Sequence, residues 1–167
     1  SLVGSEMCIR DSYSLVNATG ANSAQLAALA DVTASIVSIT NLTVTIADAT
    51  SDQSRTDQFA GLTNVQAQAL FSKASGEVTI TGNADADWID LRSFSTNGVN
   101  FRINAAAGDN VIYSGHGDDD INTGDGDDYI EVGGGQDLVV AGDGDDIIAV
   151  RSLHNACLLY TSPSPRD

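Results

Sequence analysis

The sequence predicts a mainly β protein, with a parallel β-solenoid in its C-terminal half and a small α/β segment before it. Two observations predict the solenoid: an aliphatic residue recurs at every ninth position from 103 to 148, and glycines and aspartates hold fixed places in between. A third observation predicts the preceding segment, because residues 13–81 are rich in Ala, Thr, Ser and Val and alternate between helical and strand periodicity.

The two ends of the chain are set apart from the rest. SLVGSEMCIRDS (Ser1–Ser12) and ACLLYTSPSPRD (Ala156–Asp167) resemble translated sequencing-adapter read-through and are excluded from fold reasoning. Both cysteines, both prolines and the one methionine lie in these ends. The remaining chain therefore has no disulfide framework and no cysteine-based zinc site. We expect it to be an internal piece of a longer protein.

The Ala/Thr-rich region, residues 13–81, is expected to contain two capped helices and short strands. Asn22 or Ser23 can cap the first helix, and Thr63 with Gln66 three residues later has the spacing of a capping box. The expected elements are a helix at 22–31, a strand or strand pair at 36–46, a helix at 62–73 and a strand at 77–81.

Two pairs of similar segments leave the architecture of this region open. VTIADA at 44–49 resembles VTITGNADA at 78–86, and AQLAAL at 24–29 resembles AQALF at 67–71. Two copies of a helix–strand unit would make this half a solenoid as well. The alternative is an Ala/Thr-rich domain with coincidental similarity.

The nine-residue pattern is sharpest between Ala105 and Ala149. Its units are AAAGDNVIY (105–113), SGHGDDDIN (114–122), TGDGDDYIE (123–131), VGGGQDLVV (132–140) and AGDGDDIIA (141–149). The last four units have Gly at positions two and four, Asp at position six and Ile or Val at position eight. Residues 82–104 are degenerate repeats or a transition, and residues 151–155 break the pattern after Val150.

The negative charge of the chain indicates which kinds of partner it can bind. The formal net charge is −16, which argues against nucleic acid or an anionic membrane and for cations. Residues 105–150 contain twelve Asp or Glu and no Lys or Arg. No apolar run is long enough to span a membrane.

The repeat predicts stacked carboxylates. A glycine-rich turn followed by a three-residue strand is half a coil, and coils stack about 4.8 Å apart. Two units make one coil, so Asp119 lies over Asp137, Asp128 over Asp146, and Asn110 over Asp128 as a weaker third pair. Carboxylates this close raise one another's pKa unless a cation lies between them. Oxygen-only ligands select a hard cation such as Ca²⁺, and the lack of His and Cys among these ligand positions disfavours zinc or copper.

These units resemble the GGxGxDxUx repeat of RTX proteins, the hemolysin-type calcium-binding family, whose members fold it as a parallel β-roll. The resemblance covers residues 105–149 well and 82–104 poorly. Position one is Ser, Thr, Val or Ala instead of Gly, which puts one carbonyl geometry in doubt. The resemblance implies that calcium is held by Asp119, Asp128, Asp137 and Asp146, with Asn110 as a weaker ligand, and by main-chain oxygens around Gly115, Gly117, Gly124, Gly126, Gly133, Gly135, Gly142 and Gly144.

Other interpretations explain the pattern less well. Disorder does not require an aliphatic residue at every ninth position. The spacing does not match an EF-hand loop or a phosphate-binding glycine loop. Among the remaining polar residues, the position-five aspartates Asp118, Asp127 and Asp145 are expected to be solvated and His116 to be exposed, whereas Trp88 is expected to cap the core of the first coil.

The functional hypothesis is calcium binding that drives folding of a secreted, extracellular bacterial protein; the resemblance implies export by type I secretion. We expect no catalysis in this fragment, because it contains no HExxH or GxSxG motif. The alternatives are the non-catalytic C-terminal part of a secreted RTX protease or lipase, or a segment of a large repeat adhesin. Calcium is the expected partner, and the sequence indicates no macromolecular target.

Overall fold

The computed structural model describes residues 14–17, 20–31, 36–40, 42–45, 58–94, 99–151 and 157–161. The segment 1–12, which resembles adapter read-through, lies outside these ranges. Among the described residues, no helix has the length and apolar character needed to cross a membrane.

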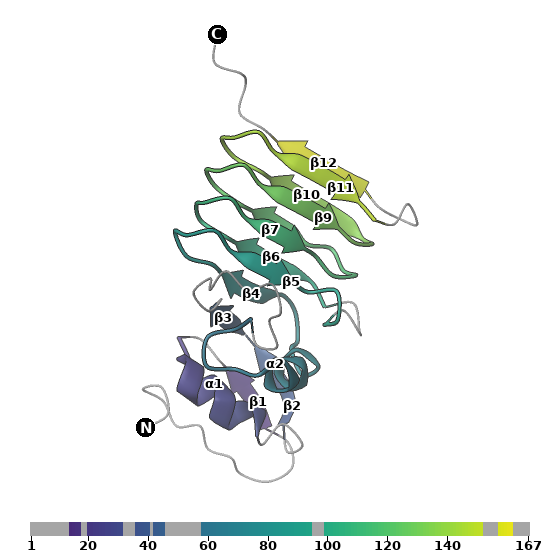
Figure 1. Cartoon of the computed structure of the whole chain (residues 1–167). Helices are drawn as coiled ribbons and strands as arrows, with labels where there is room; N and C mark the ends of the chain where they lie inside the picture. Colours follow the sequence, from purple (N-terminus) through teal and green to yellow (C-terminus); the bar gives the residue numbers. More distant parts are fainter. Residues whose placement is uncertain are drawn as a thin grey trace.

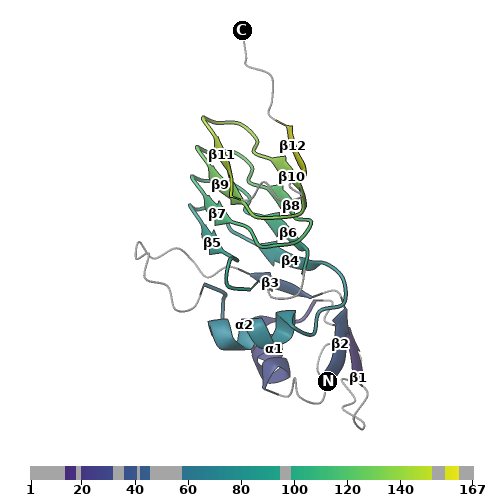
Figure 2. The same cartoon turned by 90° about the vertical axis from the view of Figure 1, so that its right-hand side faces the viewer.

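Parallel β-sheets dominate the described structure, as predicted. The six-stranded sheet has the order β12 (Cys157–Thr161), β10 (Gln136–Val140), β8 (Asp120–Asn122), β6 (Phe101–Asn104), β4 (Val78–Thr81) and β3 (Thr43–Thr45). The four-stranded sheet has the order β11 (Ile147–Val150), β9 (Tyr129–Val132), β7 (Val111–Tyr113) and β5 (Trp88–Asp90). A third sheet pairs β1 (Ser14–Asn17) with β2 (Ile36–Thr40). Figure 2 shows the two larger sheets side by side.

The chain alternates between the two larger sheets, and each coil contributes one strand to each. Arg102 in β6 pairs with Asp120 in β8, which pairs with Leu138 in β10, so successive coils are offset by eighteen residues. The other sheet repeats this offset from Val111 to Tyr129. The arrangement is that expected for a parallel roll with two nine-residue units per coil.

The position-eight aliphatic residues form the core between the sheets, which confirms their prediction from the nine-residue period. One row contains Ile103, Ile121 and Val139, and its side chains are fully buried. The row from the other sheet contains Ile112 and Ile130, also fully buried, and ends at the partly buried Ile148. Position one also points inward, as shown by the buried residues Ala105, Ser114, Thr123, Val132 and Ala141.

An insertion interrupts the period near the start of the array. Ile80 and Ile89 are nine residues apart, but Ile89 and Ile103 are fourteen apart, so the turn between them is five residues longer. Trp88 consequently pairs with Val111 at an offset of 23 residues instead of eighteen. The aromatic ring of Phe94 from this turn packs edge-on against the rings of Phe59 and Phe71, with 5.5 Å between ring centroids.

Both predicted helices form at the N-terminal end of the stack, as Figure 1 shows. α1 (Ser23–Ala30) begins after the N-cap Asn22, whose side chain accepts the N–H of Gln25. α2 (Asn64–Phe71) begins after Thr63, and the predicted capping box with Gln66 is present. Each helix is slightly shorter than predicted, because the cap residues themselves are not helical.

The sheet stack begins before the repeats. β3 pairs with β4 through Thr43 and Thr79, and β4 pairs with β6 in the same six-stranded sheet. The 36-residue offset between β3 and β4 accommodates α2. The residues on both sides of the expected boundary at 81/82 therefore share one sheet and one hydrophobic core.

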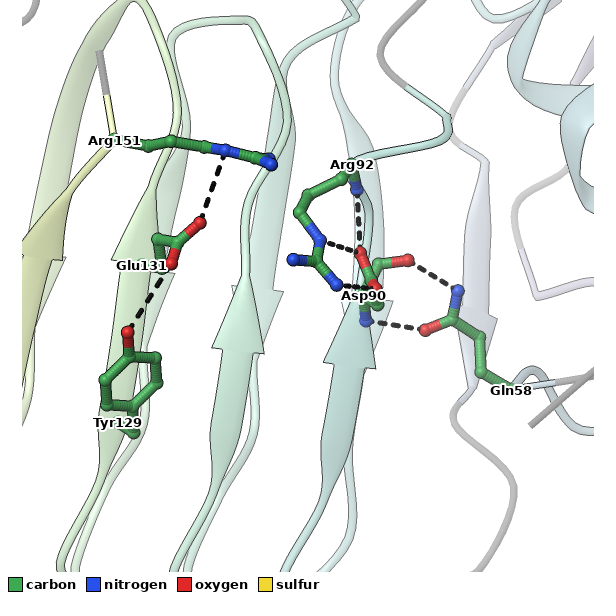
Figure 3. A network of polar contacts seen from close by, with 6 residues as sticks. All are labelled: Gln58, Asp90, Arg92, Tyr129, Glu131 and Arg151. Atoms are coloured by element: carbon green, nitrogen blue, oxygen red, sulfur yellow. Dashed lines mark hydrogen bonds and ion pairs between the residues drawn. The ribbon is translucent and has the colours of Figure 1, made fainter. Parts of the chain in front are cut away.

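Gln58 covers the N-terminal edge of the four-stranded sheet (Figure 3). Its side-chain amide accepts the N–H of Asp90 and donates to the carbonyl of Asp90, both at 2.7 Å, as a neighbouring strand would. Trp88 in the same strand is half-exposed, and its ring contacts that of Tyr113 at 5.5 Å. The prediction of Trp88 as a core cap is therefore wrong, because position seven faces outward.

The opposite end of the stack carries β12. Gln136 pairs with Cys157, an offset of 21 residues, which agrees with the break in the nine-residue pattern after Val150. An open sheet edge can pair with any extended segment through its backbone groups. This pairing therefore leaves open the origin of residues 156–167, which resemble adapter read-through.

Candidate metal centre

The position-six side chains form two rows, one on each side of the stack. The four-strand row, which precedes the strands of the four-stranded sheet, contains Asp87, Asn110, Asp128 and Asp146. The six-strand row contains Phe101, Asp119 and Asp137. All these side chains are buried except the partly exposed Asp146, and Phe101 packs against the ring of Phe71.

The structure places the three predicted pairs in adjacent coils. The N–H of Asp119 donates to Oδ1 of Asp137 at 3.0 Å, and the N–H of Asp128 donates to Oδ1 of Asp146 at 3.1 Å. The N–H of Asn110 donates to Oδ1 of Asp128 at 2.9 Å. One oxygen of each acceptor carboxylate thus joins its coil to the preceding one.

The second oxygen of two of these carboxylates lacks a hydrogen-bond donor. Oδ2 of Asp128 and Oδ2 of Asp146 are both buried and have no hydrogen-bond partner. A buried carboxylate oxygen without a donor or counter-charge is costly, so such atoms usually indicate an ion or a water. Both atoms lie in turns that contain neither His nor Cys.

The turn glycines bring main-chain carbonyls of one coil against the next. A Cβ at Gly124 would lie 1.4 Å from the carbonyl oxygen of Ala106, and one at Gly133 would lie 1.7 Å from that of Gly115. The same close approach to a carbonyl oxygen one coil earlier holds for Gly117, Gly126, Gly135, Gly142 and Gly144. Rows of carbonyl oxygens therefore accompany the rows of carboxylates.

Positive φ, which glycine tolerates, occurs at the turn glycines in only part of the array. At position two, Gly124 and Gly142 have φ of +86° and +84°, and Ala106 adopts the same conformation. The corresponding Gly115 and Gly133 in the six-strand row do not have positive φ, and neither does Gly117 at position four. For Gly117 and Gly133, close contact with the preceding coil, and not φ, requires glycine.

The position-five residues form a second hydrogen-bonded ladder. Here the side chain in the earlier coil accepts the N–H of the later coil, the reverse of the position-six rows. Oδ1 of Asp109 accepts the N–H of Asp127 at 3.0 Å, and Oδ1 of Asp127 accepts the N–H of Asp145 at 2.9 Å. Asn100, Asp118 and Gln136 are linked in the same way on the other side. Asp118, Asp127 and Asp145 are exposed as expected, yet two of them also tie coils together. His116 is exposed.

Burial is the largest effect on the pKa of three position-six carboxylates, those of Asp119, Asp137 and Asp146. It raises the pKa of Asp119 from 3.8 to about 6, against hydrogen bonds from the Phe101 N–H and from Ser114 that lower it. Burial also raises the pKa of Asp137 and of Asp146. The sequence predicted repulsion between stacked carboxylates as the cause of raised pKa values. The charge of Asp137 does raise the pKa of Asp119, but desolvation is the larger effect.

These pKa shifts predict that the calcium-free fold is more stable at pH 5 than at pH 7. A carboxyl with a raised pKa in the folded state stabilises the fold fully below its unfolded pKa, and this stability is lost as the pH rises through about 6. For Asp119 the whole shift corresponds to roughly 3 kcal/mol, of which roughly half falls between pH 5 and pH 7. Far-UV circular dichroism in chelator at both pH values compares the amount of folded array. In Asp119→Asn the pH dependence should flatten; an unchanged pH profile would contradict this assignment.

Asp87 is the position-six residue that the sequence reasoning missed. Its side chain is 2 % exposed, its Oδ2 accepts the N–H of Asn83 at 2.9 Å, and its N–H donates to Oδ1 of Asn110 at 2.9 Å. GNADADWID (82–90) keeps Asp at position six and Ile at position eight. The nine-residue spacing of Ile80 and Ile89 could have revealed this unit, but the insertion after Ile89 breaks the count.

The arrangement fits a cation held jointly by side chains and backbone. Within the described part of the chain, no three His, Cys, Asp or Glu side chains gather into a metal-binding cluster. A cation between coils would thus combine position-six carboxylates with glycine-turn carbonyls. Such an all-oxygen donor set suits Ca²⁺, which takes six to eight oxygen ligands in flexible geometry.

Comparison with known proteins supports this chemistry. A family model described as the RTX calcium-binding nonapeptide repeat (4 copies) matches residues 75–94, 102–130 and 123–150. The first match contains Asp87, and the other two contain the remaining position-six aspartates. The searches of curated proteins and of solved structures found no match.

Proposed function

Because residues 75–150 carry RTX calcium-binding nonapeptide repeats, we propose that calcium binds between successive coils of this stack and drives its folding in a secreted protein. The repeats imply calcium binding, and proteins that carry them are generally secreted. The role proposed for these residues is cation-binding and structural, not catalytic.

The observation that carries the proposal is the pair of buried carboxylate oxygens without donors. Oδ2 of Asp128 and Oδ2 of Asp146 lie in adjacent coils of the four-strand row. A divalent cation at this level gives both oxygens a partner and offsets the desolvation of the carboxylates. A neutral hydrogen-bond donor could satisfy the lone pairs but not the charge.

Without the cation, the array is expected to open. Residues 105–150 carry twelve acidic and no basic side chains, so their mutual repulsion opposes stacking of the coils. Metal binding to a site absent from the unfolded chain contributes directly to the free energy of folding. Extracellular modules bind calcium at about 10⁻⁴ to 10⁻³ M. The array would therefore be open in a calcium-poor cytoplasm and fold outside the cell, which suits export as an unfolded chain.

Far-UV circular dichroism of the chain in chelator and then in millimolar calcium tests the proposal. We expect a gain of β-structure with calcium and a much smaller gain with magnesium at the same concentration. Magnesium is the matched control because it has the same charge but prefers strict octahedral geometry and keeps its waters. An unchanged spectrum on adding calcium, or an equal gain with magnesium, would contradict calcium-driven folding.

A further inference from the structure

Asn110 is the one uncharged polar residue among the described members of the four-strand row, and it is 1 % exposed. Its side chain makes three hydrogen bonds. Oδ1 accepts the N–H of Asp87 at 2.9 Å, and Nδ2 donates to the carbonyl of Gly108 at 2.7 Å and to the carbonyl of Thr123 at 3.3 Å. All the hydrogen-bonding groups of this amide therefore have partners.

The partners fix the orientation of the amide. The Asp87 N–H requires an acceptor on one side, and the two carbonyl oxygens require a donor on the other. Reversing the amide would place its oxygen against two oxygens and its nitrogen against an N–H. The nitrogen must therefore face the carbonyls.

The two carbonyls belong to successive coils. Gly108 lies in the turn of Asn110 itself, whereas Thr123 opens the unit one coil later in the same row. The Asn110 amide nitrogen thus bridges two coils by attracting oxygen atoms from both. This is the part that a bound cation would take between coils.

The next level of the row shows the contrast. Asp128 is one coil after Asn110, and the atom that replaces the amide nitrogen is a carboxylate oxygen. Oδ2 of Asp128 is buried and has no hydrogen-bond partner. By the eighteen-residue register, the carbonyls equivalent to those of Gly108 and Thr123 belong to Gly126 and Ala141. The Ala141 carbonyl accepts the Thr123 hydroxyl at 2.9 Å, whereas Oδ2 of Asp128 receives no donor, so a cation here would give this oxygen a partner.

We propose that the Asn110 amide takes the place of a calcium ion. The coil that contains Asn110 and the coil that contains Thr123 then bind no calcium ion between them at this position and stay joined without one. This inference rests on the proposed function and adds an internal boundary to it. The coil of Asn110 stays joined to the next coil in chelator, whereas the coils after these two stack when calcium binds.

The coil before Asn110 has both kinds of contact. Oδ2 of Asp87 accepts the N–H of Asn83, but Oδ1 of Asp87 is buried and receives no hydrogen bond, like Oδ2 of Asp128. The same coil rests on the aromatic cluster of Phe71, Phe94 and Phe101, where the rings pack edge-on. Apolar packing of this kind does not depend on calcium.

Asn110→Asp tests the proposal, with Asn100→Asp as the matched control. Both changes add one negative charge, but Asn100 is a position-five residue, where Asp occurs in other units, and its Oδ1 accepts the Asp118 N–H. Calcium bound per chain is measured by titration calorimetry. Asn110→Asp is expected to bind one more calcium ion than the wild-type chain, whereas Asn100→Asp should bind the same number.

Amide hydrogen exchange in chelator gives a second readout. We expect the amides of Asp87 and Val111 to be protected in the wild-type chain, and their protection to fall by about tenfold or more in Asn110→Asp. The reverse change, Asp128→Asn, should give a chain that binds one calcium ion fewer. In chelator, the amides of the coil that contains Asp128 should then be better protected from exchange. This variant remains informative if Asn110→Asp fails to fold.

The outcomes separate the inference from the proposed function. If the wild-type chain binds calcium, but Asn110→Asp and Asn100→Asp bind the same number of ions as each other, the Asn110 amide does not replace an ion and the inference is overturned. If the wild-type chain binds no calcium, the proposed function fails. Equal protection of Asp87 and Val111 in chelator for wild type and Asn110→Asp would likewise overturn the amide bridge.

Discussion

Gly124→Ala is expected to prevent the array from stacking at that coil and to lower the free energy of unfolding by more than about 4 kcal/mol. The added Cβ would lie 1.4 Å from the carbonyl oxygen of Ala106, which is backbone and cannot rotate away. The two coils would have to separate, breaking the strand pairing and the carbonyl rows that the proposed calcium sites use. Urea unfolding in saturating calcium measures the loss.

Gly20→Ala is the control for this change. Gly20 also has positive φ, at +68°, but nothing lies within 4 Å of an added Cβ. It should therefore cost only the conformational term, about 1 to 2 kcal/mol. If Gly124→Ala were as mild as Gly20→Ala, the close stacking of the turns would be wrong.

Asp128→Ala has the next largest expected effect. It removes a buried carboxylate from the proposed calcium level and leaves the N–H of Asn110 without its acceptor. An unsatisfied buried donor costs about 1 to 3 kcal/mol, and the lost ligand weakens calcium binding further. We expect the calcium concentration at half-folding to rise by about tenfold or more, since 1.4 kcal/mol is a factor of ten.

Asp127→Ala is the matched control, because Asp127 is the adjacent aspartate and carries the same charge. Its side chain is exposed and only accepts the N–H of Asp145, which water can replace. A calcium titration followed by circular dichroism should shift by less than about threefold, which corresponds to well under 1 kcal/mol. Equal shifts for both variants would mean that diffuse negative charge, and not the buried carboxylate, attracts the cation.

Much of the stack could be predicted because its physical requirements repeat. Ile103, Ile112 and the later aliphatic residues fill the core at a fixed period, so their positions specify strand, face and register together. The same register predicts that Asp128 lies beside Asp146. The capping boxes at Asn22 and Thr63 were also readable, because a cap requires a particular side chain at a particular spacing.

The features that escaped prediction depend on contacts that spacing alone does not define. The five-residue insertion after Ile89 stops the count by nines, so residues 82–104 were predicted only as degenerate repeats or a transition, and Asp87 was not predicted as a site residue. The cover that Gln58 places on the sheet edge follows from how the N-terminal segment packs on β5. The outward face of Trp88 follows from its position seven, beside the inward Ile89. The orientation of the Asn110 amide depends on carbonyls from two coils.

Residue-resolved hydrogen exchange of the chain, in chelator and in millimolar calcium, tests calcium-driven folding most directly. The predicted result is strong protection of the amides of β9, β10 and β11 in calcium and its loss in chelator, with the helices α1 and α2 changing far less. Equal protection of these strands in both conditions would contradict the account, because the array would then fold without the ion.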